Sequence, residues 1–507
     1  MSSVFHGTLL LTAANLAIRG ISMLFQIYLS SRIGAAGLGL MQLITSVGAL
    51  ALTVGSSGIR IAAMYLCAEE YGHRRTGGIQ TAVSVCLRTG LLLSAVAGAA
   101  LYCLAPRVAQ TWIADMRALP SLRLLALFLP LTCLTSVMTG YFTACGKIRQ
   151  MVCIELGERI LSVILTFRLL SYAGNDLTRA CCAVFGGSGI TCALSFFVMY
   201  GLYRRDCTQF SAPTPRAAMR QRMLHLCLPL AANDYLRSGL STLENLLIPH
   251  GLRKSGSSAE HSMAAYGTVH GMVFPIITFP AVILWSLADV LVPELARCRA
   301  RGDVRRIRHL TDKCLRMGFV FAAAVSGTLL CTAMPLSELL YGNREAGAYL
   351  QTFAPMIPVL YLDMIVDGMH KGLGEQLACV RYNTLTSFLD VLLIFLLLPR
   401  YGISGYIFSF VATHLINFCL SIRRLFLVSG YRIRSTFCLR AGMLAAVSAA
   451  TVLGLTNLLR APLPLLALGG AYLALYFLLL TLGDVFSVSD LRWLISLLHR
   501  NKAASEG

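Results

Sequence analysis

Three arginines lie inside apolar stretches that are long enough to cross a membrane. Arg19 follows Asn15 in the first stretch, Arg60 lies in the second, and Arg237 lies in the seventh. An arginine at the centre of a bilayer costs about 2.5–3.5 kcal/mol on insertion scales, so each guanidinium should face protein or water. Guanidinium stays charged and can donate two parallel hydrogen bonds, which suits phosphate. We predict that these four residues bind an anionic group such as phosphate, with buried ion pairs between helices as the alternative.

A second group of polar residues has the chemistry of a coupling-ion site. Asn383, Ser387 and Asp390 occupy neighbouring turns of one predicted helix, and Asp234 and Thr413 come from two others. Oxygen ligands from several helices suit Na⁺, whereas a lone carboxylate in a membrane can carry a proton. The spacing predicts a site for Na⁺ or H⁺. Asp363 and Asp367 in the tenth predicted helix and Asp289 in the eighth are further candidates for it.

No motif in the sequence predicts an enzyme. A Walker A loop, a nucleophile elbow, an HExxH motif and a glycine-rich nucleotide fingerprint are all missing from the sequence. The 17 cysteines contain no CxxC pair and no Cys/His spacing typical of metal sites. Most lie in predicted helices, where a thiol packs as a small apolar side chain. We expect no enzymatic activity, no metal site and no cofactor other than the coupling ion.

The elements that must position these residues are membrane helices. A mean hydropathy of +0.70 and a charged fraction of only 13% exclude an ordinary soluble protein. About fourteen continuous apolar stretches recur along the chain, each long enough to cross about 30 Å of hydrocarbon. Because they are continuous rather than alternating, a spanning sheet is excluded. The sequence predicts an all-α integral membrane protein, with its first two spans at 8–30 and 40–66.

The basic residues predict the orientation in the membrane. The net charge of +20 does not indicate nucleic-acid binding, because most of the 43 Lys and Arg residues fall in the predicted inner connections and the C-terminus. Such a bias predicts a multi-pass protein with both termini inside the cell. The densest basic cluster, Arg297 to Arg316, is interpreted as a determinant of topology, with binding of anionic lipid headgroups as the alternative.

The sequence also repeats itself after 228 residues. Cys86-Leu-Arg-Thr-Gly90 returns as Cys314-Leu-Arg-Met-Gly318, an offset of 314 − 86 = 228. Prolines and glycines elsewhere match at the same offset: Pro130 with Pro358, Gly140 with Gly368, Gly146 with Gly374, Gly174 with Gly402, and Gly39 with Gly267. Two homologous six-helix halves are typical of transporters, in which the halves rock around a central cavity.

The repeat predicts the organisation of the chain. The first half is predicted over 1–203 and the second over 223–430, joined by a basic cytoplasmic linker over 204–222. Residues 431–507 are predicted to hold two appended helices and an amphipathic tail at the membrane interface.

Several motifs together resemble the stage V sporulation protein B group. They are Gly34-Ala-Ala-Gly-Leu-Gly39, Gly55-Ser-Ser-Gly-Ile-Arg60, Thr139-Gly-Tyr-Phe-Thr-Ala-Cys-Gly146, Leu243-Glu-Asn-Leu-Leu-Ile-Pro249, Tyr266-Gly-Thr-Val-His-Gly-Met-Val-Phe-Pro275, Asp289-Val-Leu-Val-Pro-Glu294 and Gly372-Leu-Gly-Glu-Gln376. The similarity runs over about residues 5–430. That group looks like part of the multidrug/oligosaccharidyl-lipid/polysaccharide exporter superfamily, which includes the peptidoglycan lipid II flippases.

The resemblance implies a fold and a function. The fold is an exporter-type V-shaped bundle of two six-helix halves plus a C-terminal helix hairpin. The function is a flippase that moves an undecaprenyl-pyrophosphate-linked cell-wall or polysaccharide precursor from the inner to the outer leaflet by alternating access. Arg19, Arg60 and Arg237 stand approximately where relatives carry arginines that bind the pyrophosphate.

The resemblance also implies a Na⁺ site made by helices 7, 11 and 12. Asp234, Asn383 and Thr413 can match its acid, amide and hydroxyl ligands. Ser387 departs from the pattern, because an acid is expected one turn after the asparagine.

These inferences predict a protein of the bacterial plasma membrane whose substrate is a lipid-linked sugar pyrophosphate. Its other partners would be membrane lipids and cell-wall synthesis proteins, and no nucleic acid. Two alternatives stay open. A cation-coupled drug exporter of the same fold would depend on acids and aromatic residues, and a non-transporting scaffold for cell-wall or spore-envelope assembly would not need the cavity charges.

Overall fold

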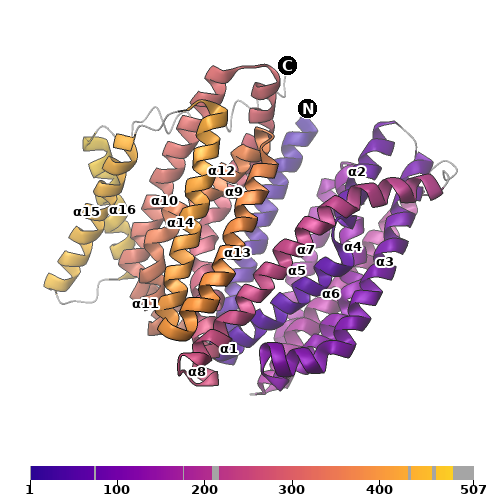
Figure 1. The fold of residues 1–507 in the computed structure, drawn as a ribbon, viewed down its shortest axis with the longest axis horizontal. Helices are drawn as coiled ribbons and strands as arrows, with labels where there is room; N and C mark the ends of the chain where they lie inside the picture. The colour runs from indigo at the N-terminus through magenta and orange to yellow at the C-terminus, as the bar shows by residue number, and fades with distance from the viewer. Residues whose placement is uncertain are drawn as a thin grey trace. The chain divides into compact units, whose positions relative to one another are not determined.

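The structure, a computed structural model, describes residues 2–73, 76–174, 176–207, 216–431, 435–459 and 464–483. Long helices dominate these residues (Figure 1). The first seven are α1 (Ser2–Ser56), α2 (Ile59–Gly72), α3 (Thr76–Arg107), α4 (Leu119–Ala144), α5 (Ile148–Ala173), α6 (Leu177–Cys207) and α7 (Arg216–Lys254). The others are α8 (Ala259–Thr268), α9 (Phe274–Ala300), α10 (Val304–Tyr341), α11 (Arg344–Phe353), α12 (Ile357–Gly372), α13 (Gln376–Tyr401), α14 (Ile403–Ser429), α15 (Ser435–Leu459) and α16 (Leu465–Leu482). Short π or 3-10 segments join some of them, namely η1 (Val108–Ile113), η2 (Met116–Ala118), η3 (Val269–Val273) and η4 (Ala354–Met356).

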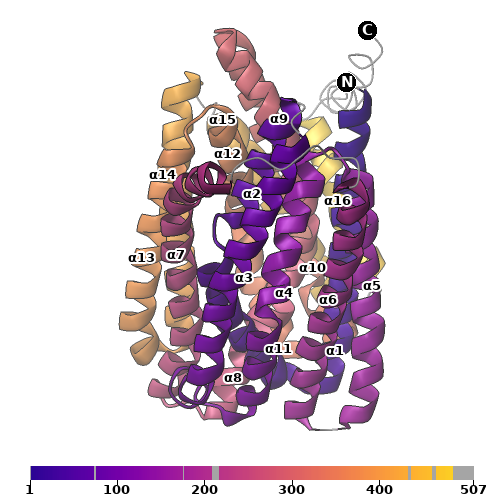
Figure 2. The same cartoon turned by 90° about the vertical axis from the view of Figure 1, so that its right-hand side faces the viewer.

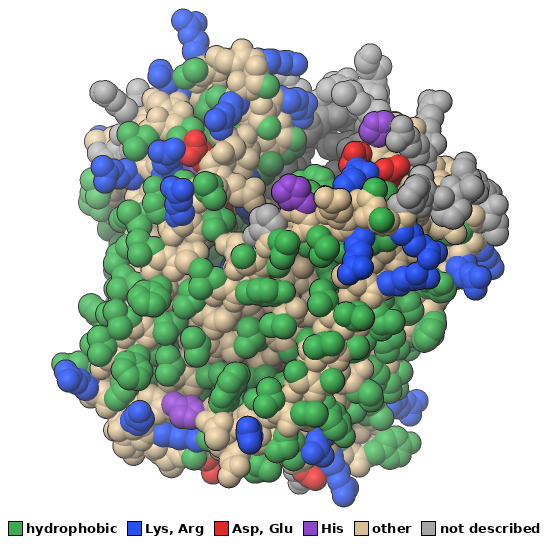
Figure 3. All heavy atoms as spheres, turned by 45° about the vertical axis from the view of Figure 1, so that its right-hand side comes forward, with side chains coloured by type: hydrophobic (Ala, Val, Ile, Leu, Met, Phe, Trp, Pro, Cys, Tyr) green, Lys and Arg blue, Asp and Glu red, His purple; other side chains and the backbone are tan. Residues whose placement is uncertain are grey.

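The helices have the length and composition of membrane spans, which confirms the predicted class. Eleven helical segments of the described chain are long and apolar enough to cross a membrane. The helices α5 and α7, with 26 and 39 residues, are also long enough but carry more polar and charged residues. On the face drawn in Figure 3, hydrophobic side chains form a broad band, and Lys and Arg side chains gather beyond its two edges.

The second predicted span, 40–66, is wrong as a single helix. The helix α1 kinks at Gly34 (φ 70°, ψ −178°), ends at Ser56, and is followed by a break before α2. Gly58 in this break is left-handed, with φ at 73°, and a Cβ there would lie 2.9 Å from the carbonyl oxygen of Cys227. Only glycine permits both the backbone angle and this approach of α7.

Helix boundaries recur at the offset predicted from the sequence. The α3–η1 segment spans Thr76–Ile113 and α10 spans Val304–Tyr341, so both ends differ by 228. The same offset relates Met116–Ala144 to Arg344–Gly372. It also relates α5 to α13, since 376 − 148 and 401 − 173 are both 228. The glycines that follow α5 and α13 have almost the same backbone angles (φ 62°, ψ −135° and φ 58°, ψ −139°).

Packing divides the chain into two compact units that do not coincide with the repeat. The first comprises Met1–Arg253 and Ser257–Gly267, and the second comprises Lys254–Gly256 and Thr268–Gly507. The helix α7 therefore packs in the first unit although it begins the second repeat. The predicted ends of the two halves, at 203, 223 and 430, refer to the sequence repeat and not to these packing units. They stay predictions.

Two predicted segments lie outside the described residues. They are 208–215 of the basic linker and 484–507, which include the predicted interfacial tail.

In the first unit α3 packs on α4, and α6 packs on both α4 and α5 (Figure 2). The helices α1 and α8 meet at two glycines, Gly39 and Gly267, that correspond in the repeat. A Cβ on Gly39 would overlap the carbonyl oxygen of Met263, and a Cβ on Gly267 would overlap that of Ala35. Only glycine at both positions allows the two helix backbones to approach this closely.

In the second unit α12 packs on α9, α10 and α14, and α13 packs on α14. The helices α15 and α16 contact each other and both pack on α10 (Figure 1). The hydroxyl of Tyr472 on α16 donates to the carbonyl of Ala323 on α10 at 3.0 Å. The predicted C-terminal hairpin is therefore confirmed and is an integral part of the second unit.

Candidate substrate and ion sites

The three predicted arginines all lie on helices of the first unit. Arg19 is half-buried in α1, one turn after the exposed Asn15. Arg60 and Arg237 are exposed. Arg60 lies twelve residues before Gly72, the end of α2, which is about 18 Å along a helix. Arg237 is the twenty-second of the 39 residues of α7. Arg237 therefore lies near the middle of α7, whereas Arg60 is the second residue of α2.

Arg60 also stands at the start of a helix. The first backbone hydrogen bond of α2 runs from the N–H of Ala62 to the carbonyl of Gly58, so the preceding N–H groups have no partner within α2. A helix N-terminus favours an anion because its free N–H groups and its dipole both point toward it. The carboxylate of Glu155 on α5 lies within electrostatic range of Arg60. The break in the second span thus combines a guanidinium group with a helix end that suits phosphate.

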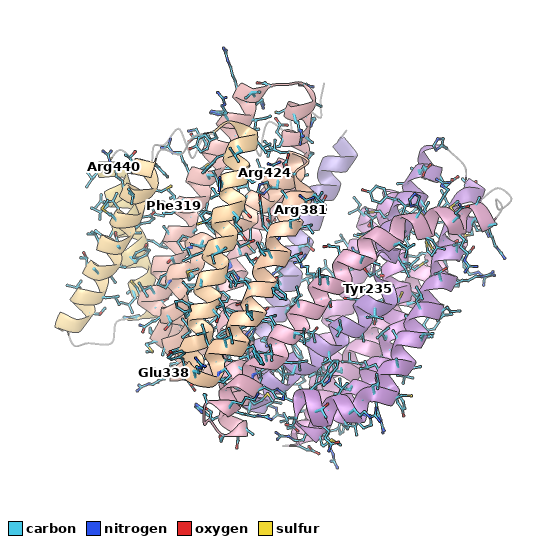
Figure 4. All side chains as sticks on the ribbon, viewed as in Figure 1. Tyr235, Phe319, Glu338, Arg381, Arg424 and Arg440 are labelled. Atoms are coloured by element: carbon cyan, nitrogen blue, oxygen red, sulfur yellow. The ribbon has the colours of Figure 1, made fainter. Side chains whose placement is uncertain are left out.

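A ladder of polar contacts joins α7 to α1 and α2 in antiparallel order. The Ser57 hydroxyl donates to Asp234 at 2.7 Å, and the Tyr235 hydroxyl donates to the carbonyl of Val54 at 3.2 Å (Figure 4). Further along, the Thr242 hydroxyl donates to the carbonyl of Ser46 at 3.3 Å. Asp234 is therefore held by Ser57, and it makes no ion pair with Arg237 among the described residues.

An ion pair joins α7 to α2 at the end of this ladder that is predicted to be cytoplasmic. Arg222 on α7 pairs with Glu69 and, at 3.2 Å, with Glu70 on α2. The Glu70 side chain is only 7% exposed, so Arg222 supplies the counter-charge for a buried carboxylate. Sequence reasoning missed this pair, because the two partners are 152 residues apart.

The predicted coupling-ion residues are only partly brought together. In the second unit the Thr413 hydroxyl donates to Asp390 at 3.2 Å, and both side chains are buried. The Asn383 amide instead donates to the sulfur of Cys379 at 3.5 Å, and Ser387 is half-buried on the same helix. Asp234, the remaining member, belongs to the first unit.

Two further acids on α12, Asp363 and Asp367, join this region. The Asn417 amide donates to Asp363 at 2.9 Å and accepts from the Thr386 hydroxyl at 3.3 Å. The thiol of Cys379 donates to Asp367 at 2.9 Å. In the sequence both acids are only further candidates for the ion site. The sequence feature that points to them is the four-residue spacing of polar side chains on α12, α13 and α14. This spacing places the polar side chains of each helix on one face of that helix.

An ion pair also lies at the turn between α12 and α13. Arg424 on α14 donates to Glu375 at 2.7 Å (Figure 4). Glu375 corresponds in the repeat to Lys147 (147 + 228 = 375), which pairs with Asp206 in the first unit at 2.5 Å. Each half thus ties this turn to its sixth helix by an ion pair, with the charges reversed.

Comparisons with known proteins agree with this fold. Stage V sporulation protein B of Bacillus subtilis (strain 168) is 22% identical over 413 residues, covering 79% of each chain. The sporulation protein YkvU of the same organism is 20% identical over 250 residues, covering 48% of this chain and 56% of that one.

Solved structures show the same architecture at lower identity. The inward closed conformation of the lipid II flippase MurJ matches with a TM-score of 0.67 and 12% identity, over 98% of this chain and all of that one. An inward-facing multidrug resistance transporter of the MATE family matches with a TM-score of 0.63 and 15% identity, over 83% of this chain and all of that one. The exporter fold predicted from the sequence is confirmed, and it is a fold of transporters and flippases rather than of enzymes.

The polysaccharide biosynthesis protein family matches residues 4–297, which is more than half of the sequence. This multi-pass membrane protein therefore belongs to the polysaccharide biosynthesis protein family.

Proposed function

We propose that this protein is a flippase that moves an undecaprenyl-pyrophosphate-linked cell-wall or polysaccharide precursor from the inner to the outer leaflet. The observation that carries the proposal is the exposure of two arginines, Arg60 at the break between α1 and α2 and Arg237 near the middle of α7, with no ion pair to either among the described residues. An arginine in a membrane protein must face protein, water or an anionic ligand. Pyrophosphate is a ligand that guanidinium binds through paired, charge-assisted hydrogen bonds.

The family and the fold support this substrate class. The family description names polysaccharide biosynthesis, and one structure of similar fold is a lipid II flippase. A lipid-linked sugar keeps its polyprenyl chain in the bilayer while its charged head crosses, so the protein must shelter pyrophosphate from hydrocarbon. Arginines inside the bilayer can do this, because guanidinium replaces the water that solvates the phosphates.

Alternating access and its energy source are part of the proposal. We place the protein in the bacterial plasma membrane with both termini inside, as the distribution of basic residues predicts. Na⁺ or H⁺ is the proposed coupling ion, and Asp390 and Thr413 are the predicted ligands that lie within hydrogen-bond distance of each other.

The test is leaflet reversal in liposomes containing the purified protein. Labelled lipid II and a labelled capsule-type lipid-linked sugar are compared for wild type, Arg19→Ala, Arg60→Ala and Arg237→Ala. The matched control is Arg344→Ala, because Arg344, the first residue of α11, has an 82% exposed side chain and pairs with Glu338 of α10. Reversal that is lost in the three variants and kept in the control supports the flippase, and the preferred lipid identifies the head group.

Two results would count against it. Wild-type reversal by all three variants would remove the arginines from the mechanism. No reversal of either lipid by folded wild-type protein would favour the drug exporter, which predicts drug efflux dependent on acids, or the scaffold, which predicts neither activity.

A further inference from the structure

The basic cluster at the turn between α9 and α10 has no counterpart in the first half of the sequence. Residues 297–316 contain eight basic and two acidic side chains, whereas the residues that correspond in the repeat, 69–88, contain three basic and two acidic ones. Both segments are predicted to lie on the cytoplasmic side, where basic residues of any short connection favour the same orientation. Orientation alone therefore gives no reason to concentrate the charge in the second half.

Half of the basic side chains in this cluster have no acidic partner. Arg297 and Arg306 share the carboxylate of Glu294 on α9. Four others are exposed and make no ion pair among the described residues, namely Arg299, Arg301, Arg305 and Arg308. An exposed guanidinium group without an acid beside it can bind an anion at the membrane surface.

One face of α10 brings part of this charge to the end of α14. Arg308, Asp312 and Arg316 are spaced by four residues, which places them on one face of α10. Arg308 lies against Gly430, the left-handed residue that follows α14, because a Cβ on Gly430 would lie 2.8 Å from Nη2 of Arg308. The hydroxyl of Tyr431 donates to Asp312 at 2.6 Å. These two contacts hold the end of α14 on the basic face of α10.

The start of α15 packs on the same face of α10. The guanidinium group of Arg316 lies over the ring of Phe437, 4.3 Å from its centroid. Arg440 follows three residues later, so it lies beside Phe437 on the surface of α15 (Figure 4). Arg440 is exposed and makes no ion pair among the residues that the structure describes. Three helices thus bring three guanidinium groups and two aromatic rings to one place, which we call the α10–α14–α15 junction.

The junction combines the two kinds of surface that a phospholipid needs. Its arginines outnumber its one acid, Asp312, and guanidinium binds phosphate through paired, charge-assisted hydrogen bonds. Beside Arg440, α15 carries an exposed apolar face that suits acyl chains. Residues spaced by four make up this face, namely Leu439, Met443 and Val447. A charged site that continues into an apolar face is typical of an amphiphilic ligand and exceeds what a soluble anion needs.

We propose that the α10–α14–α15 junction binds an anionic phospholipid. Its phosphate lies on Arg308, Arg316 and Arg440, and its acyl chains lie along the exposed face of α15. Tyr431 and Asp312 position the end of α14 beside the phosphate. The bound lipid then links the C-terminal hairpin to α10 and α14. This inference does not rest on the proposed function, because binding needs neither a lipid-linked sugar nor transport.

The binding test uses the purified full-length protein in nanodiscs without any lipid-linked sugar. Thermal unfolding is followed while phosphatidylglycerol replaces phosphatidylcholine at constant total lipid. We expect saturable stabilisation, because a ligand that binds only the folded state stabilises it, and we expect salt to weaken the effect. Soluble glycerol phosphate and a poly-glutamate peptide are added separately to discs of phosphatidylcholine alone. Equal stabilisation by glycerol phosphate would identify a site for a soluble phosphate, equal stabilisation by the peptide would identify a surface for an acidic protein, and either result overturns the proposal.

Two variants and a matched control separate a built site from diffuse surface charge. Arg308→Gln and Arg440→Gln each remove one exposed guanidinium group from the junction, and each should weaken the apparent affinity for phosphatidylglycerol about fivefold. Arg301→Gln removes the same charge from the α9–α10 turn outside the junction, and it should respond as wild type does. An equal loss in all three variants would show unspecific attraction. That result, or unchanged affinity in both junction variants, overturns the proposal.

Retention of the lipid is measured separately by native mass spectrometry. Wild type and Arg301→Gln should keep one phosphatidylglycerol molecule as detergent is removed, and the double variant of Arg308→Gln with Arg440→Gln should keep none. Arg316→Lys, which keeps the charge but loses the paired donors, should also retain less lipid, and it replaces the double variant if that protein does not fold. Equal retention in all proteins overturns the proposal. A failed flippase assay would leave these outcomes unaffected, because no lipid-linked sugar is present.

Discussion

Arg60 is the residue whose surroundings most favour an anionic ligand. It is exposed at the second position of α2, it lies two residues after the left-handed Gly58, and it stands among backbone N–H groups that have no partner within α2. Each of these features alone has a structural explanation. Together they place a fixed positive charge beside a helix end that favours an anion.

Replacing Arg60 by lysine tests whether its geometry matters as well as its charge. Lysine keeps the charge but loses the paired donors, so we expect flipping by Arg60→Lys to fall about 10- to 100-fold, equivalent to about 1.5–3 kcal/mol. Arg60→Ala should abolish it. The measurement is the initial rate of leaflet reversal at matched protein density. Equal rates for Arg60→Lys and wild type would mean that Arg60 acts only through its charge.

Glu70 and Arg222 form an ion pair whose two halves differ in exposure, and this predicts asymmetric effects on stability. Arg222→Ala leaves the buried Glu70 carboxylate without its counter-charge and should lower the free energy of unfolding by about 1–3 kcal/mol. The loss is smaller than for a fully buried ion pair, because Arg222 is 41% exposed and solvent screens its charge. Adding Glu70→Gln should restore most of the loss. Thermal unfolding of the single and double variants measures this. A double variant as unstable as Arg222→Ala would show that the buried charge is not the cause.

At the scale of elements, the continuous apolar stretches predicted nearly all the helices, but not the break within the second. A run of apolar residues that contains Ser57 and Gly58 is compatible with a continuous span, and glycine is common in membrane helices. The break depends on Cys227 and Asp234, which approach from α7 far along the chain. The residues of the second apolar stretch alone cannot predict the break, because its partners lie in a distant part of the sequence.

The contact between α1 and α8 predicts a strong difference between two glycine substitutions. Gly267→Ala places a methyl group against the backbone of α1 and should lower the unfolding temperature markedly. Gly157→Ala in α5 meets nothing within 4 Å, and it should leave stability unchanged or raise it by up to about 1 kcal/mol, because alanine favours helix. Thermal unfolding in one detergent compares them. Similar behaviour of the two variants would show that the close approach is not required.

The candidate sites were predictable to different degrees. Arginines in apolar stretches can be read directly, because a buried charge is rare and has few explanations. Asp390 and Thr413 were also anticipated, and they do form a contact. Asp363 and Asp367 could not be ranked from the sequence, because their contacts with Asn417 and Cys379 come from two other helices. Partners across helices follow from three-dimensional packing, which spacing along one helix does not specify.

At the scale of the whole molecule, the repeat predicts which turns lie on the same side of the membrane. The turn at Gly302 between α9 and α10 should be cytoplasmic, and the turn at Gly342 between α10 and α11 should be external. Both glycines are left-handed and lie outside the helices. A protease site inserted at Gly302 should be cut only in inverted vesicles, and one at Gly342 only in intact cells treated to expose the membrane. The opposite pattern would reverse the proposed orientation.

The packing of α7 in the first unit has a consequence for synthesis on the ribosome. The chain is made from its N-terminus, and a repeat boundary near residue 207 would suggest that the first six-helix half is finished early. Yet three residues of this half contact residues that are synthesised later. The pairs are Glu70 with Arg222, Ser57 with Asp234, and Gly39 with Gly267. Nascent chains therefore pass through a stage in which six helices are inserted, Glu70 has not yet met Arg222, and the backbone of α1 at Gly39 is not yet covered by α8. The membrane insertion machinery must shelter this intermediate until more than half of the polypeptide has emerged.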